Sequence, residues 1–243
     1  MKILVAETYE DMSRMACNDL MALLDSHPKP LICAASGDSP KDLYQHLALE
    51  VKQKQIDTAN WNFVGLDEWA GMNETDEGSC RYHLDRQLFG PLNVANEQLC
   101  FFNGRANDLQ AECHRVETFI EQQGGIDVAI VGLGLNGHVG MNEPGTSAHL
   151  GCHIADIDPL TQQVGQKYFN RPAVLTHGLT LGMANLQQAK MVMVLVSGSG
   201  KADIVQRMLT EEASEQLPAT LLRNHPDCRV YLDQAAAELL PSR

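Results

Sequence analysis

Apolar residues recur along this chain in two patterns, short continuous runs and stripes with helical spacing. Continuous runs fit strands that are buried on both faces, and we expect strands at residues 30–35, 61–66, 99–102, 126–131, 174–181, 191–197 and 229–232. Stripes at every third or fourth position fit amphipathic helices, and we expect helices at residues 8–25, 39–51, 80–89, 107–123, 158–168 and 200–211 and after Asp233.

The alternation of strands and helices predicts the fold class. Repeated strand–helix units give an α/β fold with a doubly wound, mainly parallel, Rossmann-like sheet and helices on both faces. Right-handed crossovers bring the loops at the carboxyl ends of the strands to one crevice. The length of 243 residues fits a single domain spanning 1–243. From 145 to about 171 the pattern is weak, which is typical of lids and binding segments.

Charge and composition exclude several partners. The chain has 18 Lys and Arg against 31 Asp and Glu, a formal net charge of −13. Nucleic acid and anionic membranes both require a basic face, so we expect neither, whereas a small phosphate needs only a few local donors. No apolar run is long enough for a membrane span or a signal peptide. The seven cysteines are scattered without a C-x-x-C pair, which predicts reduced thiols, no metal site and a cytoplasmic protein.

The stretch 132–145 carries the strongest chemical signal. It reads Gly-Leu-Gly-Leu-Asn-Gly-His-Val-Gly-Met-Asn-Glu-Pro-Gly and follows the strand expected at 126–131. Glycines let the backbone approach a ligand closely, and the polar side chains of Asn136, His138 and Glu143 fall where open α/β sheets bind ligands. We therefore predict a catalytic loop, with a purely structural Gly-rich loop as the alternative.

The same stretch also matches a dinucleotide-binding fingerprint, Gly132-x-Gly134-x-x-Gly137. That fingerprint places its third glycine in a helix that receives the pyrophosphate. Two further glycines and a proline follow within eight residues here, and these residues disfavour a helix. A nicotinamide site is therefore not the preferred interpretation.

Three other loops at strand ends carry polar groups. In the first, 34–40, Ser36 and Ser39 adjoin a helix N-terminus that favours an anion, although plain N-capping by Ser39 is an equal alternative. In the second, 65–69, the adjacent carboxylates of Asp67 and Glu68 follow a strand. Burial in a crevice would raise the pKa of one of them into the range of a general base, whereas a solvated charge pair is the plain alternative.

The third loop, 197–201, ends in Lys201 after Ser-Gly-Ser-Gly. A lysine beside glycines and serines at the start of a helix suits a phosphate. Taken alone, a solvated lysine is the plainer interpretation, and the spacing does not match a Walker motif.

Together the four loops make the chain resemble the glucosamine-6-phosphate deaminase/isomerase family, which includes the 6-phosphogluconolactonases. The matching motifs are Ser-Gly-x-Ser-Pro at 36–40, Leu-Asp-Glu-Trp at 66–69, Gly-x-Gly-x-Asn-Gly-His-x-Gly-x-Asn-Glu-Pro at 132–144 and Gly-Ser-Gly-Lys at 198–201. Lactonases lack the Asn142-Glu143-Pro144 that follows the Gly-His pair here, so this tripeptide resembles the deaminase branch. Asp-Glu-Trp and the tract 132–138 are more similar to galactosamine-6-phosphate deaminases.

The resemblance implies conversion of an amino-hexose 6-phosphate and water to a ketohexose 6-phosphate and ammonia, with no cofactor. It implies that His138 opens the sugar ring, that Glu143 orients or polarises the imidazole, that Asn136 assists, and that Asp67 moves a proton between two carbons. The implied substrate and phosphate ligands are Ser36, Gly37, Ser39, Glu68, Gly137, Lys167, Arg171 and Lys201. The stretch 144–170 would be a lid.

The chain departs from this family at two positions. Many members have an aspartate where this chain has Asn136, and an amide adds no charge, so we expect a less basic His138 here. Where the family has a phosphate-binding arginine, this chain has Lys167, which keeps the charge but loses the bidentate fork. Arg171 is the alternative for that role. The chain is also shorter than the hexameric, allosteric members, although self-association remains allowed.

Two other functions remain open. A 6-phosphogluconolactonase would share the fold and the phosphate site but would not need Asp67. A non-catalytic sugar-phosphate sensor would predict an attached DNA-binding segment, which the sequence and its negative charge do not favour.

Overall fold

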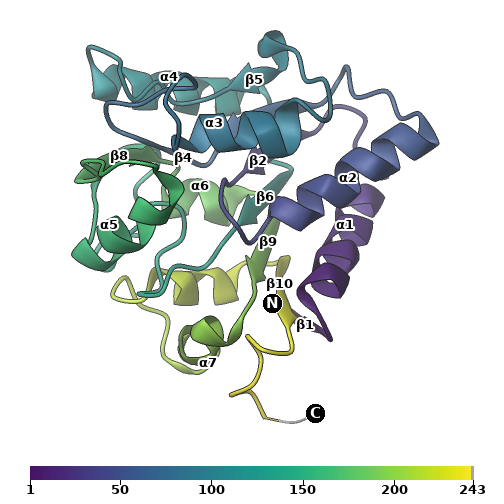
Figure 1. Cartoon of the computed structure of the whole chain (residues 1–243), viewed down its shortest axis with the longest axis vertical. Coiled ribbons are helices and arrows are strands. Elements are labelled where there is room, and N and C mark those ends of the chain that lie inside the picture. The colour runs from purple at the N-terminus through teal and green to yellow at the C-terminus, as the bar shows by residue number, and fades with distance from the viewer. Residues whose placement is uncertain (242–243) are drawn as a thin grey trace.

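The computed structural model describes residues 1–241, and its centre is a parallel sheet of seven strands in the order β1-β10-β9-β6-β2-β3-β5 (Figure 1). Cys33 pairs with Ala129, and Ala129 pairs in turn with Val192, so the central strands lie in register. The α/β fold with a parallel central sheet is confirmed. The strands are β1 (Lys2–Ala6), β2 (Leu31–Ala34), β3 (Asn62–Gly65), β5 (Leu99–Cys100), β6 (Val128–Val131), β9 (Met191–Val196) and β10 (Cys228–Asp233).

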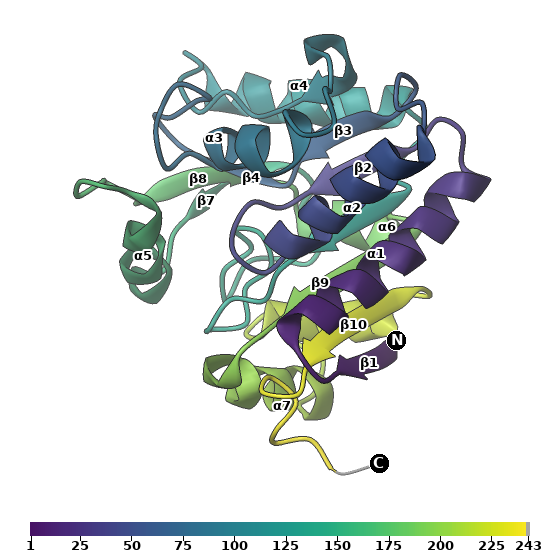
Figure 2. The ribbon, with the colours of Figure 1, turned by 45° about the vertical axis from the view of Figure 1, so that its right-hand side comes forward.

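Helices cover both faces of this sheet, because alternate strand residues point to opposite faces. Ile32 packs into the cluster under one set of helices, and Cys33 packs under the other. The first set is α1 (Tyr9–Ser26), α2 (Lys41–Lys54) and α3 (Cys80–Leu84) with the π-helical turn η1 (Asp85–Phe89). The second set is α4 (Leu109–Gln122), α6 (Met183–Gln188), α7 (Ala202–Thr210) and the 3-10 helix η5 (Pro218–Asn224). Figure 2 shows α1 and α2 in front of the sheet.

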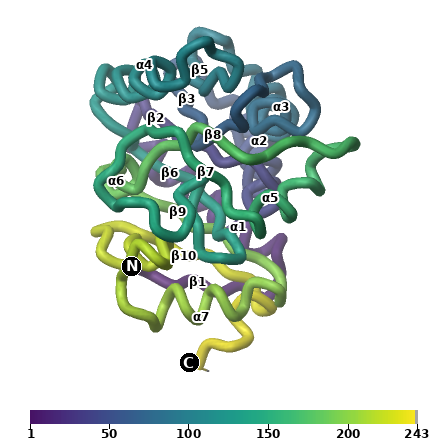
Figure 3. The backbone as a smooth tube through the Cα atoms, turned by 90° about the vertical axis from the view of Figure 1, so that its left-hand side faces the viewer, coloured from purple at the N-terminus to yellow at the C-terminus, as the bar shows by residue number. Residues whose placement is uncertain are grey.

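The order of the strands determines which elements are far apart. The edge strands β5 and β1 are separated by the whole width of the sheet. In Figures 1 and 3 α4 and β5 therefore lie at one end of the molecule and α7 lies at the other. The loops that follow the central strands β2, β6 and β9 fall between these ends.

A second, smaller sheet is antiparallel and has three strands in the order β4-β8-β7. It joins β4 (Asp67–Trp69), β8 (His177–Thr180) and β7 (His153–Asp156), and its core includes Trp69, Met141 and Leu175. The strand expected at 174–181 therefore forms as β8 but does not join the parallel sheet. Between β7 and β8 lie α5 (Pro159–Gly165) and the 3-10 turn η3 (Gln166–Tyr168), which cover most of the helix expected at 158–168.

Other expectations were wrong in detail. The residues of β1 pair with β10, although no strand was expected there. From 234 to 241 the chain makes turns and no helix: the Asp233 carboxylate accepts from Ala236 N–H (2.7 Å) and caps an isolated turn, and it also accepts from Gly198 N–H (3.0 Å). Helix α2 begins after Pro40 with no side-chain cap, so Ser39 does not act as the N-cap.

No helix within residues 1–241 is long and apolar enough to cross a membrane.

Candidate active site

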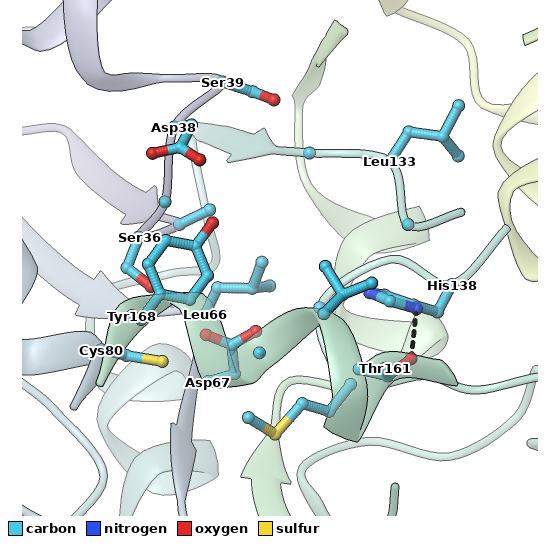
Figure 4. A pocket seen from close by; sticks show the side chains of 18 of the residues that line it. Ser36, Asp38, Ser39, Leu66, Asp67, Cys80, Leu133, His138, Thr161 and Tyr168 are labelled. Atoms are coloured by element: carbon cyan, nitrogen blue, oxygen red, sulfur yellow. Dashed lines mark hydrogen bonds between the residues drawn. The ribbon is translucent and has the colours of Figure 1, made fainter. Parts of the chain in front are cut away.

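One pocket gathers the loops that follow β2, β3, β6 and β9, together with the segment that contains α5 and η3 (Figure 4). The carboxyl ends of parallel strands meet at one edge of the sheet, which explains why loops distant in sequence converge there. The residues of this pocket that the sequence had indicated are Ser36, Gly37, Ser39, Asp67, His138, Lys167 and Lys201.

The loop after β2 has a shape that only glycine allows at its centre. Gly37 has a φ of +114°, and a Cβ there would lie 3.1 Å from the hydroxyl of Tyr168. A larger residue would therefore strain the backbone and push against Tyr168. Ser36 and Ser39 flank this glycine and line the pocket (Figure 4). Hydroxyls and loop N–H groups in this arrangement can hold an anion.

The adjacent carboxylates of β4 have separate environments, because successive strand residues face opposite ways. Asp67 lines the pocket. Burial raises its pKa to about 6, and a hydrogen bond from Cys80 together with the charge of His138 limits the rise. Glu68 is fully buried, and its carboxylate accepts from the backbone N–H groups of Trp69 (2.8 Å), Cys80 (2.9 Å) and Arg81 (3.0 Å).

Glu68 is thus not brought to the pocket, contrary to the substrate-binding role that the resemblance implied. Its carboxylate holds the start of α3 against β4 instead. Burial raises the pKa of Glu68 to about 7, and its three backbone hydrogen bonds oppose this rise. Glu68 therefore holds backbone segments next to the pocket in place and does not line the pocket itself.

His138 is held from behind by Asn136 and Glu143. The Nδ2 of Asn136 donates to Glu143 Oε2 (2.7 Å), so its Oδ1 faces the imidazole Nδ1 at 2.7 Å. Nδ1 therefore carries the hydrogen, and Nε2 keeps a lone pair that can accept a proton. The hydroxyl of Thr161, on α5, lies 3.1 Å from the same Nδ1 (Figure 4).

Glu143 supplies the negative charge of this cluster. Its Oε2 lies 3.5 Å from Nδ1 of His138, and the residue is only 5% exposed. Burial raises the pKa of Glu143, but hydrogen bonds from His138 and Asn136 prevail and hold it below its usual range. The carboxylate is therefore ionised at neutral pH and can stabilise a charged imidazole.

Two lysines contribute positive charge. Lys201 donates to the carbonyl of Leu133, and burial, with the nearby charge of Lys167, lowers the pKa of Lys201 to about 8. An anion beside it would restore the charged form. Lys167 donates to Asp38 (2.6 Å), and both side chains are half exposed or more.

Other predicted residues do not line the pocket. Gly137 has a φ of +86° and forms the turn behind His138, where a Cβ would meet Leu217 at 2.1 Å. Asn136 and Glu143 lie behind the imidazole, as described above. Arg171 is exposed and stands outside the lining, so Lys167 is the cation that this segment brings to the pocket.

The pocket also includes residues that the sequence analysis did not single out as ligands. Those with polar side chains include Asp38, Cys80, His83, Thr161 and Tyr168. Tyr168 follows Lys167 in the sequence, so the predicted phosphate ligand Lys167 could have indicated that Tyr168 also lies at the pocket. Thr161 and His83 lie on helices that long-range packing brings to the pocket, and local sequence carries no sign of that. Among residues 1–241 no group of three His, Cys, Asp or Glu is placed to hold a metal ion.

Comparison with known proteins gives one consistent family. Residues 5–231 match the family described as glucosamine-6-phosphate isomerases/6-phosphogluconolactonase. A glucosamine-6-phosphate deaminase of Oceanobacillus iheyensis is 34% identical over 239 residues, covering 98% of this chain and 96% of that protein. A putative deaminase of Escherichia coli K12, AgaI, is 38% identical over 220 residues, covering 90% of this chain and 86% of that protein.

Solved structures agree with this assignment. A structure described as a monomeric glucosamine-6-phosphate deaminase superposes with a TM-score of 0.95 at 32% identity, covering 98% of this chain and all of that one. A 6-phosphogluconolactonase of Trypanosoma brucei superposes with a TM-score of 0.76 at 21% identity, covering 99% of this chain and 98% of that one. The second likeness shows the shared fold alone.

Proposed function

The chain belongs to the family of glucosamine-6-phosphate isomerases and 6-phosphogluconolactonases, and we propose that it is a deaminase/isomerase of an amino-hexose 6-phosphate. Water and the amino sugar phosphate would yield a ketohexose 6-phosphate and ammonia. The observation that carries this proposal is one pocket lined by the Asp67 carboxylate, the hydrogen-bonded imidazole of His138 and two lysines. The relatives named as deaminases support the reaction class.

The first step opens the sugar ring. His138 takes the proton of the anomeric hydroxyl on Nε2 and gives it to the ring oxygen, so the bond from that oxygen to the anomeric carbon breaks and an aldehyde forms. Asn136 fixes the tautomer through Nδ1, and Glu143 stabilises the imidazolium while it carries the proton. The aldehyde makes the neighbouring C2 hydrogen acidic.

Asp67 then moves that hydrogen. Its carboxylate takes the proton from C2 and returns it to C1, while the C2 ammonium of the substrate gives one proton to the C1 oxygen. A protonated imine at C2 and a hydroxyl at C1 result. Water adds to C2 and gives both of its protons to the departing nitrogen, so a C2 carbonyl forms and ammonium leaves. A pKa of about 6 suits a base at neutral pH, because the carboxylate is ionised and yet basic enough to accept a carbon-bound proton. The phosphate would lie against Ser36, Gly37, Ser39, Lys167 and Lys201.

The substrate epimer is a finer question. We propose galactosamine 6-phosphate and glucosamine 6-phosphate as the two substrates to compare, because a putative deaminase named AgaI and several glucosamine-6-phosphate deaminases are similarly related to this chain. All seven cysteines are free, six of them buried. Free thiols fit a protein of a reducing compartment, and we propose that the enzyme acts in the cytoplasm.

Ammonia release from each of the two sugar phosphates tests the proposal. We expect turnover of at least one, and the ratio of kcat/KM identifies the epimer. Asp67→Asn should lower kcat by about 10³-fold, since the base proposed for the proton transfer between C2 and C1 is removed. No ammonia from either sugar would contradict the proposal. Hydrolysis of a 6-phosphogluconolactone that survives Asp67→Asn would favour the lactonase alternative.

A further inference from the structure

Cys80 is the cysteine that lines the pocket, together with Asp67 of β4 and Ser36 of the loop after β2. It is the first residue of α3 and is only 5% exposed. In Figure 4 its sulfur points toward the Asp67 carboxylate, and Ser36 lies on the same side of the pocket. The sulfur therefore lies close to the Asp67 carboxylate, on the same side of the pocket as Ser36.

The direction of a contact between the two side chains follows from the groups involved. An ionised carboxylate only accepts, so only the S–H of Cys80 can donate between Cys80 and Asp67. The hydroxyl of Ser36 is a further donor on the same side of the sulfur.

The backbone of Cys80 is fixed independently of its side chain. Its N–H donates to Oε1 of Glu68 at 2.9 Å, and the same oxygen accepts from Trp69 N–H at 2.8 Å. Glu68 follows Asp67 directly in β4, so the strand that carries the carboxylate also anchors the residue that donates to it. The position of the sulfur relative to Asp67 is therefore set by a short, buried loop of contacts.

The thiol is suited to donate and not to attack. Burial and the nearby carboxylates of Asp67 and Glu68 raise the pKa of Cys80 well above its usual value. The thiol therefore stays protonated throughout the range in which Asp67 titrates, and it is a poor nucleophile. A neutral donor beside a partly desolvated carboxylate stabilises the ionised form without adding a charge.

We propose that Cys80 is a positioning residue for the proton transfer, and that its thiol donates to Asp67 and holds the carboxylate in place at the pocket. This inference rests on the proposed role of Asp67 as the base. It assigns to the thiol two effects, one on the orientation of the carboxylate and one on the pH at which it becomes ionised.

Two substitutions of Cys80 distinguish these effects of the thiol donor from the effect of lost side-chain packing. Cys80→Ala removes the donor, so the acidic limb of the kcat/KM profile should move to higher pH by about half a unit to one unit, the size of one neutral hydrogen bond. Cys80→Ser keeps a donor of similar size, so its acidic limb should stay at the wild-type position or move to lower pH. Both profiles are measured by ammonia release between pH 5 and 9.

The substrate phosphate and amine titrate identically in every variant, so a difference between profiles belongs to the protein. Cys113→Ala is the matched control, because it removes a buried thiol from α4 that does not line the pocket. Its acidic limb should not move. In Cys80→Ala kcat should also fall about tenfold while KM changes little, as expected when a carboxylate is less well oriented.

The outcomes distinguish this inference from the function it rests on. Wild-type protein that releases no ammonia would contradict the proposed function. An active wild-type enzyme whose acidic limb is the same in Cys80→Ala would overturn the role of the thiol and leave the function intact. Equal alkaline shifts in Cys80→Ala and Cys80→Ser would also overturn it, because the serine retains a donor.

Discussion

At the scale of single residues, a step of one position along β4 separates two carboxylates into different roles. Asp67 faces the pocket, whereas Glu68 is fully buried among three backbone N–H groups. Strand alternation alone accounts for this separation. The pair therefore resembles a chemical motif in the sequence, yet only one member can touch a ligand.

The imidazole site is the second feature at this scale, and it predicts the effect of Glu143→Gln. The variant removes the charge that stabilises the imidazolium of His138, so we expect kcat to fall by about 10²-fold with KM nearly unchanged. The pKa of Glu143 lies below its usual range, so this deficit should persist across the neutral pH range. Steady-state kinetics of ammonia release measure both constants.

A matched control exists in Glu112→Gln. Glu112 is also a buried carboxylate, 8% exposed, and it pairs with Arg115 at 2.7 Å on α4, outside the pocket. That variant should lose stability and keep its kcat. A kcat for Glu143→Gln as high as that of the control would mean that Glu143 supports the loop without supporting proton transfer.

At the scale of elements, the segment that carries α5 and η3 makes two exposed polar contacts with neighbouring loops, in addition to the contact of Thr161 with His138. Lys167 donates to Asp38 (2.6 Å), and Asn170 donates to Glu77 (2.6 Å). The first contact is unusual in its location, because Asp38 lies in the loop proposed to bind a phosphate. Its carboxylate both repels an incoming dianion and pairs with a cation that the dianion would use.

Replacement of Asp38 by alanine should therefore strengthen substrate binding. Because both side chains are half exposed or more, the gain is limited to about 1 kcal/mol, or up to about fivefold in KM at low ionic strength. The gain should shrink with added salt, since exposed charges are screened. KM for the sugar phosphate measured at two salt concentrations tests this.

Glu77→Ala is the control at the same scale. It breaks the other contact of the segment, to Asn170, and removes an equal charge without freeing Lys167. Its KM should stay the same or rise. A rise in KM for Asp38→Ala would contradict the prediction and would mean that Asp38 holds Lys167 in its binding position.

Elements also show where sequence alone is informative. The short apolar runs at 126–131 and 191–197 predicted β6 and β9, because a strand covered on both faces is apolar at nearly every position. The small antiparallel sheet could not be foreseen, since the pairing of β7 with β8 joins residues separated by a helix and depends on long-range contacts. The turns after Asp233 were mistaken for a helix because an N-cap residue also starts isolated turns.

At the scale of the whole molecule, topology explains why part of the site was predictable. Ser36, Asp67, His138 and Lys201 each follow a strand of the central sheet, and parallel strands bring such loops together. Thr161 and Lys167 reach the same pocket from the segment between β7 and β8. The position of these two side chains depends on long-range packing of the segment, which the local sequence pattern does not encode.

The stability of the whole molecule should depend on Glu68 in a way that pH reveals. The pKa of Glu68 is raised by burial from 4.5 to about 7. The folded protein therefore binds more protons than the unfolded chain between these values. The stabilisation linked to this group is complete below about pH 4.5 and is lost as pH rises through about 7, a change on the order of 3 kcal/mol.

Glu68→Gln removes this titration and keeps a side chain of the same shape, although its amide NH₂ cannot accept from Arg81 N–H. The variant should be less stable than wild type near pH 5, and the deficit should shrink or reverse by pH 8. Glu112→Gln should show nearly the same deficit at both values, because the Arg115 pair prevails over burial and lowers the pKa of Glu112, so its titration lies below pH 5. Urea unfolding at pH 5 and pH 8 measures both, and a deficit of Glu68→Gln that is the same at the two values would show that Glu68 is ionised in the fold throughout this range.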